Sequence, residues 1–180
     1  MSHHFHSYYC IKSADNCSWD QGEEEIGLIR WARSNSLWIL PFNSGSCNGC
    51  DIEIVASRAP KYDLERFGIL FKGSPRHADI LAVTGPISRQ ARSRLLRIYN
   101  QMPEPKYVIA IGSCAISGAP FHGSYSHYEG VQNVLPVDVY VGGCPPRPEA
   151  IIDGMLRICL LYTSPSPRDL STSRMPSSAW

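Results

Sequence analysis

The chain has 180 residues, of which 43% are hydrophobic, and a formal net charge of +1. A chain of this length can bury about two thirds of its unfolded surface in one domain, so it needs no disulfides for stability. Its arginines and lysines are dispersed and its apolar runs fall far short of the roughly twenty residues that span a bilayer, which excludes a nucleic-acid-binding protein and a transmembrane helix.

The two ends of the chain differ in composition from its middle. Residues 1–25 mix His, Tyr, Ser and acidic residues without a sustained period, and we expect a mobile leader there. From residue 162 onward Ser and Pro dominate, a composition that builds no core, so we expect a disordered or artefactual tail over 162–180. The single folded domain is therefore predicted to span 26–161, beginning with a short amphipathic helix.

The first strand leads directly into a pair of cysteines. The apolar run Leu37–Phe42 predicts a buried strand, and a glycine-rich turn with Cys47 and Cys50 follows it. Residues 52–56 should be helical, with Asp51 near the helix start, where the helix dipole favours a carboxylate. Two thiols three positions apart in such a turn indicate a place for a soft metal.

The middle of the chain alternates strands and helices. We expect a short turn followed by a strand within Tyr62–Phe71, a loop at Ser74–His77, and a buried strand over Ala78–Thr84 that Gly85-Pro86 closes. Residues 88–101 have the period of a helix. That helix carries Arg89, Arg92, Arg94 and Arg97. These arginines form either a solvated helix face or a patch for an anionic partner.

Two more cysteines follow apolar strands in the last third. Tyr107–Ile111 runs into Gly112-Ser113-Cys114, and Val137–Val141 runs into Gly142-Gly143-Cys144. Between them, residues 115–136 are rich in glycine, proline, aromatic residues and histidine without a period, which predicts a long loop that acts as a lid or a partner surface. Residues 147–161 predict the last helix, with Pro148 in its first turn.

Alternation of strands and helices indicates an α/β fold with a mostly parallel sheet. The carboxyl ends of parallel strands lie along one edge, so Cys47, Cys50, Cys114 and Cys144 should meet there. Cys10, Cys17 and Cys159 lack the strand–glycine setting. A chain without an export signal stays where thiols are kept reduced, so these cysteines indicate metal or redox chemistry.

Several chemistries use a CxxC motif. Alone, it fits a thioredoxin-like dithiol, half a zinc site or half an iron–sulfur site. A dithiol does not explain two further cysteines at strand ends, and structural zinc usually takes its second pair from another close CxxC. Cys144 is followed by Pro145, as in the Cys-Pro that ends many ferredoxin cluster sequences. The pattern favours a [4Fe–4S] cluster, with zinc as the alternative.

Five stretches together resemble a known family. They are Ser46–Glu53, Tyr62–Gly68, Ser74–Asp79, Gly112–Cys114 and Pro136–Pro146. They are similar to the small subunit of energy-converting, membrane-bound [NiFe] hydrogenases, which are relatives of the complex I 20 kDa subunit. The resemblance implies a flavodoxin-like, three-layer α/β domain that binds one [4Fe–4S] cluster through Cys47, Cys50, Cys114 and Cys144.

The resemblance also implies a function in electron relay. The cluster would pass electrons between a catalytic large subunit and a ferredoxin-like iron–sulfur subunit, and the chain would have no hydrogen activity alone. With membrane subunits, the complex would lie peripherally at the cytoplasmic side of the cell membrane. Complex I subunits carry two adjacent cysteines where this chain has CxxC, which favours a hydrogenase. A quinone or sulfur reductase subunit and a zinc-stabilised non-enzymatic module remain alternatives.

Three other polar residues have two interpretations each. Glu53, one helical turn after Cys50, either assists proton movement at the subunit interface or serves as a cap or salt-bridge partner. Arg76 and His77 either donate hydrogen bonds near the cluster and raise its potential or make ordinary loop contacts.

Overall fold

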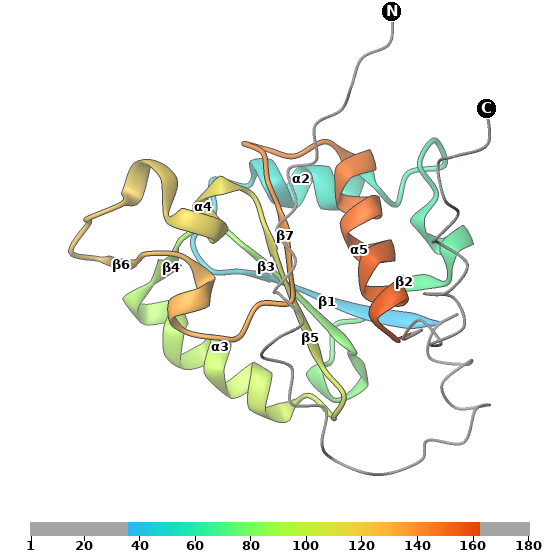
Figure 1. Cartoon of the computed structure of the whole chain (residues 1–180), viewed down its shortest axis with the longest axis horizontal. Coiled ribbons are helices and arrows are strands. Elements are labelled where there is room, and N and C mark those ends of the chain that lie inside the picture. Colours follow the sequence, from blue (N-terminus) through green and yellow to red (C-terminus); the bar gives the residue numbers. More distant parts are fainter. Residues whose placement is uncertain (1–35, 163–180) are drawn as a thin grey trace, which may run out of the picture.

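The computed structural model describes residues 36–162 (Figure 1). The predicted leader, the predicted helix at its end and nearly all of the predicted tail lie outside these residues. The three domain boundaries therefore stay predictions.

A five-stranded parallel sheet forms the centre of the molecule, with the strand order β2-β1-β3-β5-β7. Its strands are β1 (Leu37–Asn43), β2 (Ile69–Phe71), β3 (Ile80–Thr84), β5 (Tyr107–Ile111) and β7 (Val139–Val141). This is the flavodoxin-like order, in which the chain changes direction across the sheet between β1 and β3. The predicted fold class is confirmed.

Four strands of the sheet end in register with one another. Asn43 of β1 is paired with Thr84 of β3, Thr84 with Ile111 of β5, and Ile111 with Val141 of β7. The loops that follow these strands therefore start side by side. Three of these four loops carry the cysteines that the sequence singled out.

Helices cover both faces of the sheet (Figure 1). On one face, α2 (Gly49–Ala56) and α5 (Pro148–Tyr162) bury side chains such as Ile54 and Ile151 against Ile80. On the other face, α3 (Arg89–Gln101) buries Leu95 against Leu81. Strands β3 and β5 are buried along their whole length, because alternate side chains enter the two cores.

The segment 115–136 differs from the predicted irregular loop. It begins within α4 (Ser113–Ser117) and continues through η4 (Ala119–Phe121), β6 (His127–Tyr128) and η5 (Val131–Asn133). Strand β6 pairs antiparallel with β4 (Ile87–Ser88) to form a second, two-stranded sheet. Each of these elements is too short to leave a period in the sequence, which is why the pattern predicted none. The remaining elements are η2 (Leu64–Phe67) and η3 (Pro75–His77).

Local signals set the ends of α3. The Ser88 hydroxyl accepts a hydrogen bond from the Ala91 amide at 3.2 Å and so caps the helix, and Pro103 follows shortly after its last turn. Among residues 36–162, no helix combines the length and the apolar character that a membrane crossing requires.

Candidate metal centre

The cysteines lie in loops that are bonded to one another. Cys50 is the second residue of α2, Cys114 is in the first turn of α4, and Cys144 follows β7. The Gly112 amide donates to the Val141 carbonyl at 2.8 Å, and the Ser113 amide donates to the Gly143 carbonyl at 2.8 Å. These bonds pair the loops after β5 and β7, which carry Cys114 and Cys144.

Glycines provide the space in which the sulfurs lie. Gly112 has a φ of +92°, and a Cβ built on it would lie 2.5 Å from the Cys50 sulfur. A Cβ on Gly49 would lie 3.6 Å from the Cys47 sulfur and 3.8 Å from the Pro145 ring. The Cys50 sulfur thus lies against the β5 loop, and the Cys47 turn approaches the residue after Cys144. All three loops meet at one place.

The electrostatics of the thiols reflect this proximity. Burial raises the pKa of Cys50 to about 12, and the charges of Asp51, Cys114, Cys47 and Cys144 contribute in the same direction. Burial also raises the pKa of Cys114, with contributions from Cys144 and Cys47. The Cys50 and Cys114 thiols are therefore poor nucleophiles as they stand, whereas a bound metal would stabilise their thiolates.

The donor set fits an iron–sulfur cluster. Cys50 is buried, Cys114 is half-buried, and Cys47 and Cys144 are exposed, so the thiols extend from the core of the sheet edge to its surface. Among residues 36–162, no three His, Cys, Asp or Glu side chains are arranged closely enough to hold a single metal ion. In a cubane cluster each thiolate binds a different iron, so its ligands are spaced more widely than those of one ion.

Cys159 is separate from this group. It lies in the last part of α5 and packs against the hydrophobic core. Burial raises its pKa, with no contribution from Cys47, Cys50, Cys114 or Cys144. Cys10 and Cys17 lie outside the described residues.

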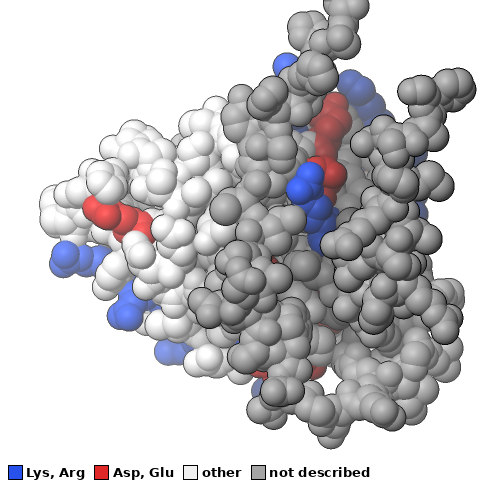
Figure 2. All heavy atoms as spheres, viewed as in Figure 1, with Lys and Arg blue, Asp and Glu red and all other residues white. Residues whose placement is uncertain are grey.

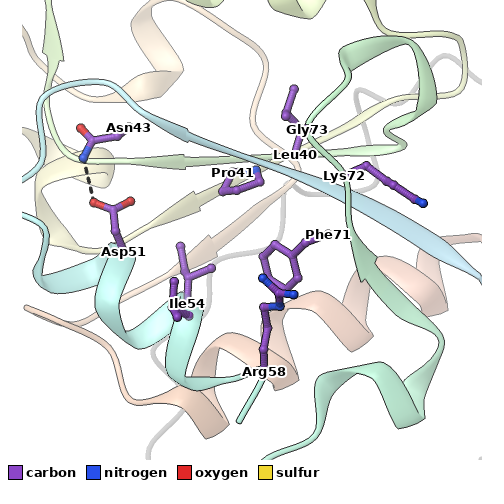
Figure 3. Close-up of a pocket in the computed structure, with 10 residues that line it drawn as sticks. Leu40, Pro41, Asn43, Asp51, Ile54, Arg58, Phe71, Lys72 and Gly73 are labelled. Atoms are coloured by element: carbon purple, nitrogen blue, oxygen red, sulfur yellow. Dashed lines mark hydrogen bonds between the residues drawn. The ribbon is translucent and has the colours of Figure 1, made fainter.

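Asp51 is the centre of a hydrogen-bond network that the sequence did not predict. Its carboxylate accepts from the Asn43 amide nitrogen at 2.8 Å (Figure 3). It also accepts from the Thr84 hydroxyl at 2.8 Å and from the Ser46 hydroxyl. The network joins the ends of β1 and β3 to the first turn of α2, which carries Cys50. A signal was present, since Asn43 and Thr84 are polar residues at the ends of apolar strands.

The loop after β3 braces the turn that contains Cys47. The buried Ser44 donates its hydroxyl to the Thr84 carbonyl at 2.8 Å, and the Ser44 amide donates to the same oxygen at 3.0 Å. Gly85, at a φ of +78°, approaches so closely that a Cβ on it would lie 2.4 Å from the Ser46 nitrogen. The turn that carries Cys47 is therefore held by the Asp51 network and by the contacts with Thr84 and Gly85.

The structure places the other predicted polar residues differently. Glu53 lies half-buried on α2, within a helical turn of Cys50. Arg76 and His77 are exposed on η3, before β3 begins, and the His77 ring lies 6.0 Å from that of Trp38 near the start of β1. They are at the amino edge of the sheet, so the structure does not bring them together with the cysteines.

A groove lies next to the cysteine edge. It has a volume of about 620 Å³ and runs between β1, α2 and the residues that follow β2 (Figure 3). Its walls are mainly apolar and include Pro41, Ile54 and Phe71, with the Arg58 guanidinium 5.1 Å from the Phe71 ring centre. Asp51 and Asn43 line the same groove, so it reaches the network that holds the Cys50 turn.

Large hydrophobic side chains are exposed on two segments near this edge. In α2, Ile52 is 64% exposed and Val55 is 65% exposed. In the segment after α4, Phe121 is 40% exposed and Tyr125 is 86% exposed. Exposed apolar groups around a functional edge indicate a surface that another protein covers.

Residues 47–158 match the family described as NADH ubiquinone oxidoreductase, 20 kDa subunit. The probable membrane-bound hydrogenase subunit mbhJ of Pyrococcus furiosus is 54% identical over 134 residues, which cover 74% of this chain and 80% of that protein. A subunit of the NADH-quinone oxidoreductase of Carboxydothermus hydrogenoformans is 52% identical over 132 residues, covering 73% of this chain and 78% of the relative.

A solved structure is also similar. A chain in the structure of the membrane-bound sulfane sulfur reductase, an archaeal respiratory membrane complex, superimposes with a TM-score of 0.67 at 40% identity. The match covers 75% of this chain and 75% of that chain.

Proposed function

Because the chain belongs to the family of the 20 kDa subunit of NADH ubiquinone oxidoreductase, and is thus a complex I-like subunit of an oxidoreductase complex, we propose that it is the electron-transfer small subunit of a membrane-bound [NiFe] hydrogenase. It would relay electrons through one [4Fe–4S] cluster bound by Cys47, Cys50, Cys114 and Cys144. The convergence of three cysteine-bearing loops at the in-register ends of β1, β5 and β7 carries this proposal.

The chain's own residues would hold and tune the cluster. When bound, such a cluster supplies one-electron transfer, and its potential depends on burial and on hydrogen bonds to its sulfurs. The glycine at 112 leaves the Cys50 sulfur unobstructed, and the Asp51 network fixes the CxxC turn between β1 and β3. These contacts orient the thiolates before any partner docks.

The proposed partners are a large subunit with the nickel–iron centre, a ferredoxin-like iron–sulfur subunit and membrane subunits. The exposed side chains of Ile52 and Val55 beside the cysteine edge support the first of these. The Pyrococcus furiosus relative is a probable membrane-bound hydrogenase subunit, which supports a peripheral position in a membrane complex.

We also propose that Glu53 takes part in proton movement where this chain meets the large subunit. Glu53 lies half-buried within a helical turn of Cys50 and beside the exposed Ile52, which places its carboxylate near the surface proposed for the large subunit. Glu53→Gln in the assembled complex should lower hydrogen turnover while the iron content stays unchanged, and Glu53→Asp should restore part of the activity. Unchanged hydrogen turnover in Glu53→Gln would refute this role.

The test is anaerobic coexpression with the large subunit encoded nearby, whose sequence should contain two CxxC motifs for nickel. The complex should evolve H2 from reduced viologen, and this chain alone should not. Cys114→Ser in the complex should abolish electron transfer from reduced viologen to the nickel–iron centre. Hydrogen evolution by the isolated, nickel-free chain would refute the relay function.

A quinone or sulfur reductase subunit is the second candidate, and the groove of about 620 Å³ beside the CxxC turn favours it. A groove of this size with apolar walls suits an amphipathic electron acceptor. A large subunit without nickel motifs, together with quinone- or polysulfide-dependent oxidation of the reduced complex, would favour this candidate over the hydrogenase.

A further inference from the structure

Every charged residue of helix α3 is an arginine, and all of these arginines are exposed. We call Arg89, Arg92, Arg94 and Arg97 the α3 basic face. All four are exposed, and the residues between them on this side are uncharged, such as Gln90 and Ser93. Lys and Arg side chains follow α3 along the lower left edge of the molecule in Figure 2.

The arrangement opposes the stability of the helix. Arg89 is the first helical residue, and no acidic residue lies in the first turn, where the macrodipole favours negative charge. The last turn, where a basic residue would be stabilised, has none. Pairs three apart, Arg89 with Arg92 and Arg94 with Arg97, add repulsion of a few tenths of a kcal/mol each. The arginines therefore do not add to the stability of α3 through their charges.

Neighbouring acids are engaged elsewhere. The Glu104 carboxylate lies 2.9 Å from the Lys106 ammonium, and the Glu129 carboxylate lies 3.4 Å from the His122 ring. The Arg92 guanidinium lies 5.3 Å from the centre of the Tyr128 ring. Among residues 36–162, no carboxylate forms an ion pair with the α3 basic face. Four guanidinium groups on a chain of net charge +1 are thus concentrated on one helix, with no carboxylate partner in the part of the chain that the structure describes.

We propose that the α3 basic face is a docking surface for an acidic segment of another protein subunit, which would present Asp or Glu side chains at helical spacing. The inference rests on the proposed function in that it takes the chain to be part of a complex. The face lies on the side of the sheet opposite α2 and α5, so this contact is separate from the one expected at Ile52 and Val55.

The burial of the apolar side of α3 favours a protein over a lipid surface. A helix that binds a bilayer inserts its apolar side, but the apolar side of α3 is already used, with Leu95 fully buried and Met102 4% exposed against the sheet. All four cations are arginines, whose planar fork binds carboxylates and phosphates alike with two parallel hydrogen bonds, so the vesicle experiment below is needed to separate these two anions.

The contact can be located by converting arginine into a cross-linkable residue. In the purified complex with Arg94→Lys and Arg97→Lys, a carbodiimide should join these lysines to carboxylates of one copurified subunit, and mass spectrometry would identify the linked peptides. The unsubstituted complex is the matched control, since arginine does not react. Absence of cross-links from both introduced lysines would overturn the proposal.

Charge reversal provides the second test. The Arg94→Glu/Arg97→Glu variant should lose about tenfold in affinity for the complex, since two attractive contacts become repulsive. Arg66→Glu, an exposed arginine outside the face, should assemble normally. Iron content should be unchanged in every variant, which separates this inference from the cluster assignment. Arginine-dependent binding to vesicles of anionic phospholipid, with assembly unaffected, would assign the face to the membrane and refute the protein partner.

Discussion

The two edges of the central sheet use aspartate for different purposes. At the amino edge, the Asp79 carboxylate accepts from the Trp38 amide at 3.0 Å and the Asp138 carboxylate accepts from the Val108 amide at 2.8 Å. Each therefore closes the ladder at the start of a neighbouring strand. At the carboxyl edge, Asp51 accepts from side-chain donors and fixes a turn that carries two thiols.

The two edges of the sheet therefore have different roles: the amino edge stabilises the sheet, and the carboxyl edge carries the proposed cluster ligands. The amino edge satisfies its own backbone groups and presents no thiol of the proposed ligand set. The carboxyl edge combines glycines, short loops and four thiols, a set of groups that a bound cluster would complete. Substitutions at the two edges should therefore have effects of different kinds, which the following variants separate.

The largest effect is expected from the thiols. Replacing Cys47, Cys50, Cys114 or Cys144 by Ser should remove most of the bound iron, because a hydroxyl is a poor substitute for a thiolate. Cys159→Ser is the matched control and should retain the iron. Iron and sulfide analysis after anaerobic purification measures this. Equal loss of iron in Cys159→Ser and Cys114→Ser would contradict the ligand assignment.

The next effect concerns Gly112. In Gly112→Ala the new methyl group would lie 2.5 Å from the Cys50 sulfur, and we expect a clear loss of cluster occupancy. Gly73→Ala is a suitable control, because no atom lies within 4 Å of its added Cβ. The visible absorption of the cluster, relative to protein, would report the difference. A fully loaded Gly112→Ala chain would show that the glycine does not limit the site.

At the amino edge the effect should be on folding. Asp138→Ala leaves the Val108 amide without its carboxylate acceptor and should lower the free energy of unfolding by about 1 to 3 kcal/mol. Iron content per folded chain should not change. Chemical denaturation of the cluster-free chain provides the measurement. Loss of iron without loss of stability would mean that the two edges are not separate.

Cys159 should show the smallest effect. Because burial raises its pKa, alkylation of this thiol should be slow near neutral pH and should accelerate as the pH rises and the thiolate forms. In the cluster-free chain, the exposed Cys47 and Cys144 should be more accessible to the reagent. Peptide mapping after timed alkylation tests this, and rapid labelling of Cys159 at neutral pH would contradict its burial.

The sequence predicted the central sheet well and the surface less well. Strong apolar runs such as Tyr107–Ile111 placed the strands to within a few residues, and the three strands that the strand–glycine–cysteine pattern selected end in register. The assignment of the four cysteines as ligands stays a prediction. The pairing of β4 with β6 escaped detection because each has two residues and no period. The Asp51 network was not predicted either, because it depends on the register between β1 and β3, which cannot be read from a single sequence.

The most direct test of the account is the metal content of the anaerobically purified chain. We predict about four irons and four sulfides per chain, no stoichiometric zinc, and Mössbauer parameters of one [4Fe–4S] cluster that disappear in Cys114→Ser. One tightly bound zinc per chain, with no iron or labile sulfide even after anaerobic reconstitution, would contradict the electron-relay function and favour a structural zinc site.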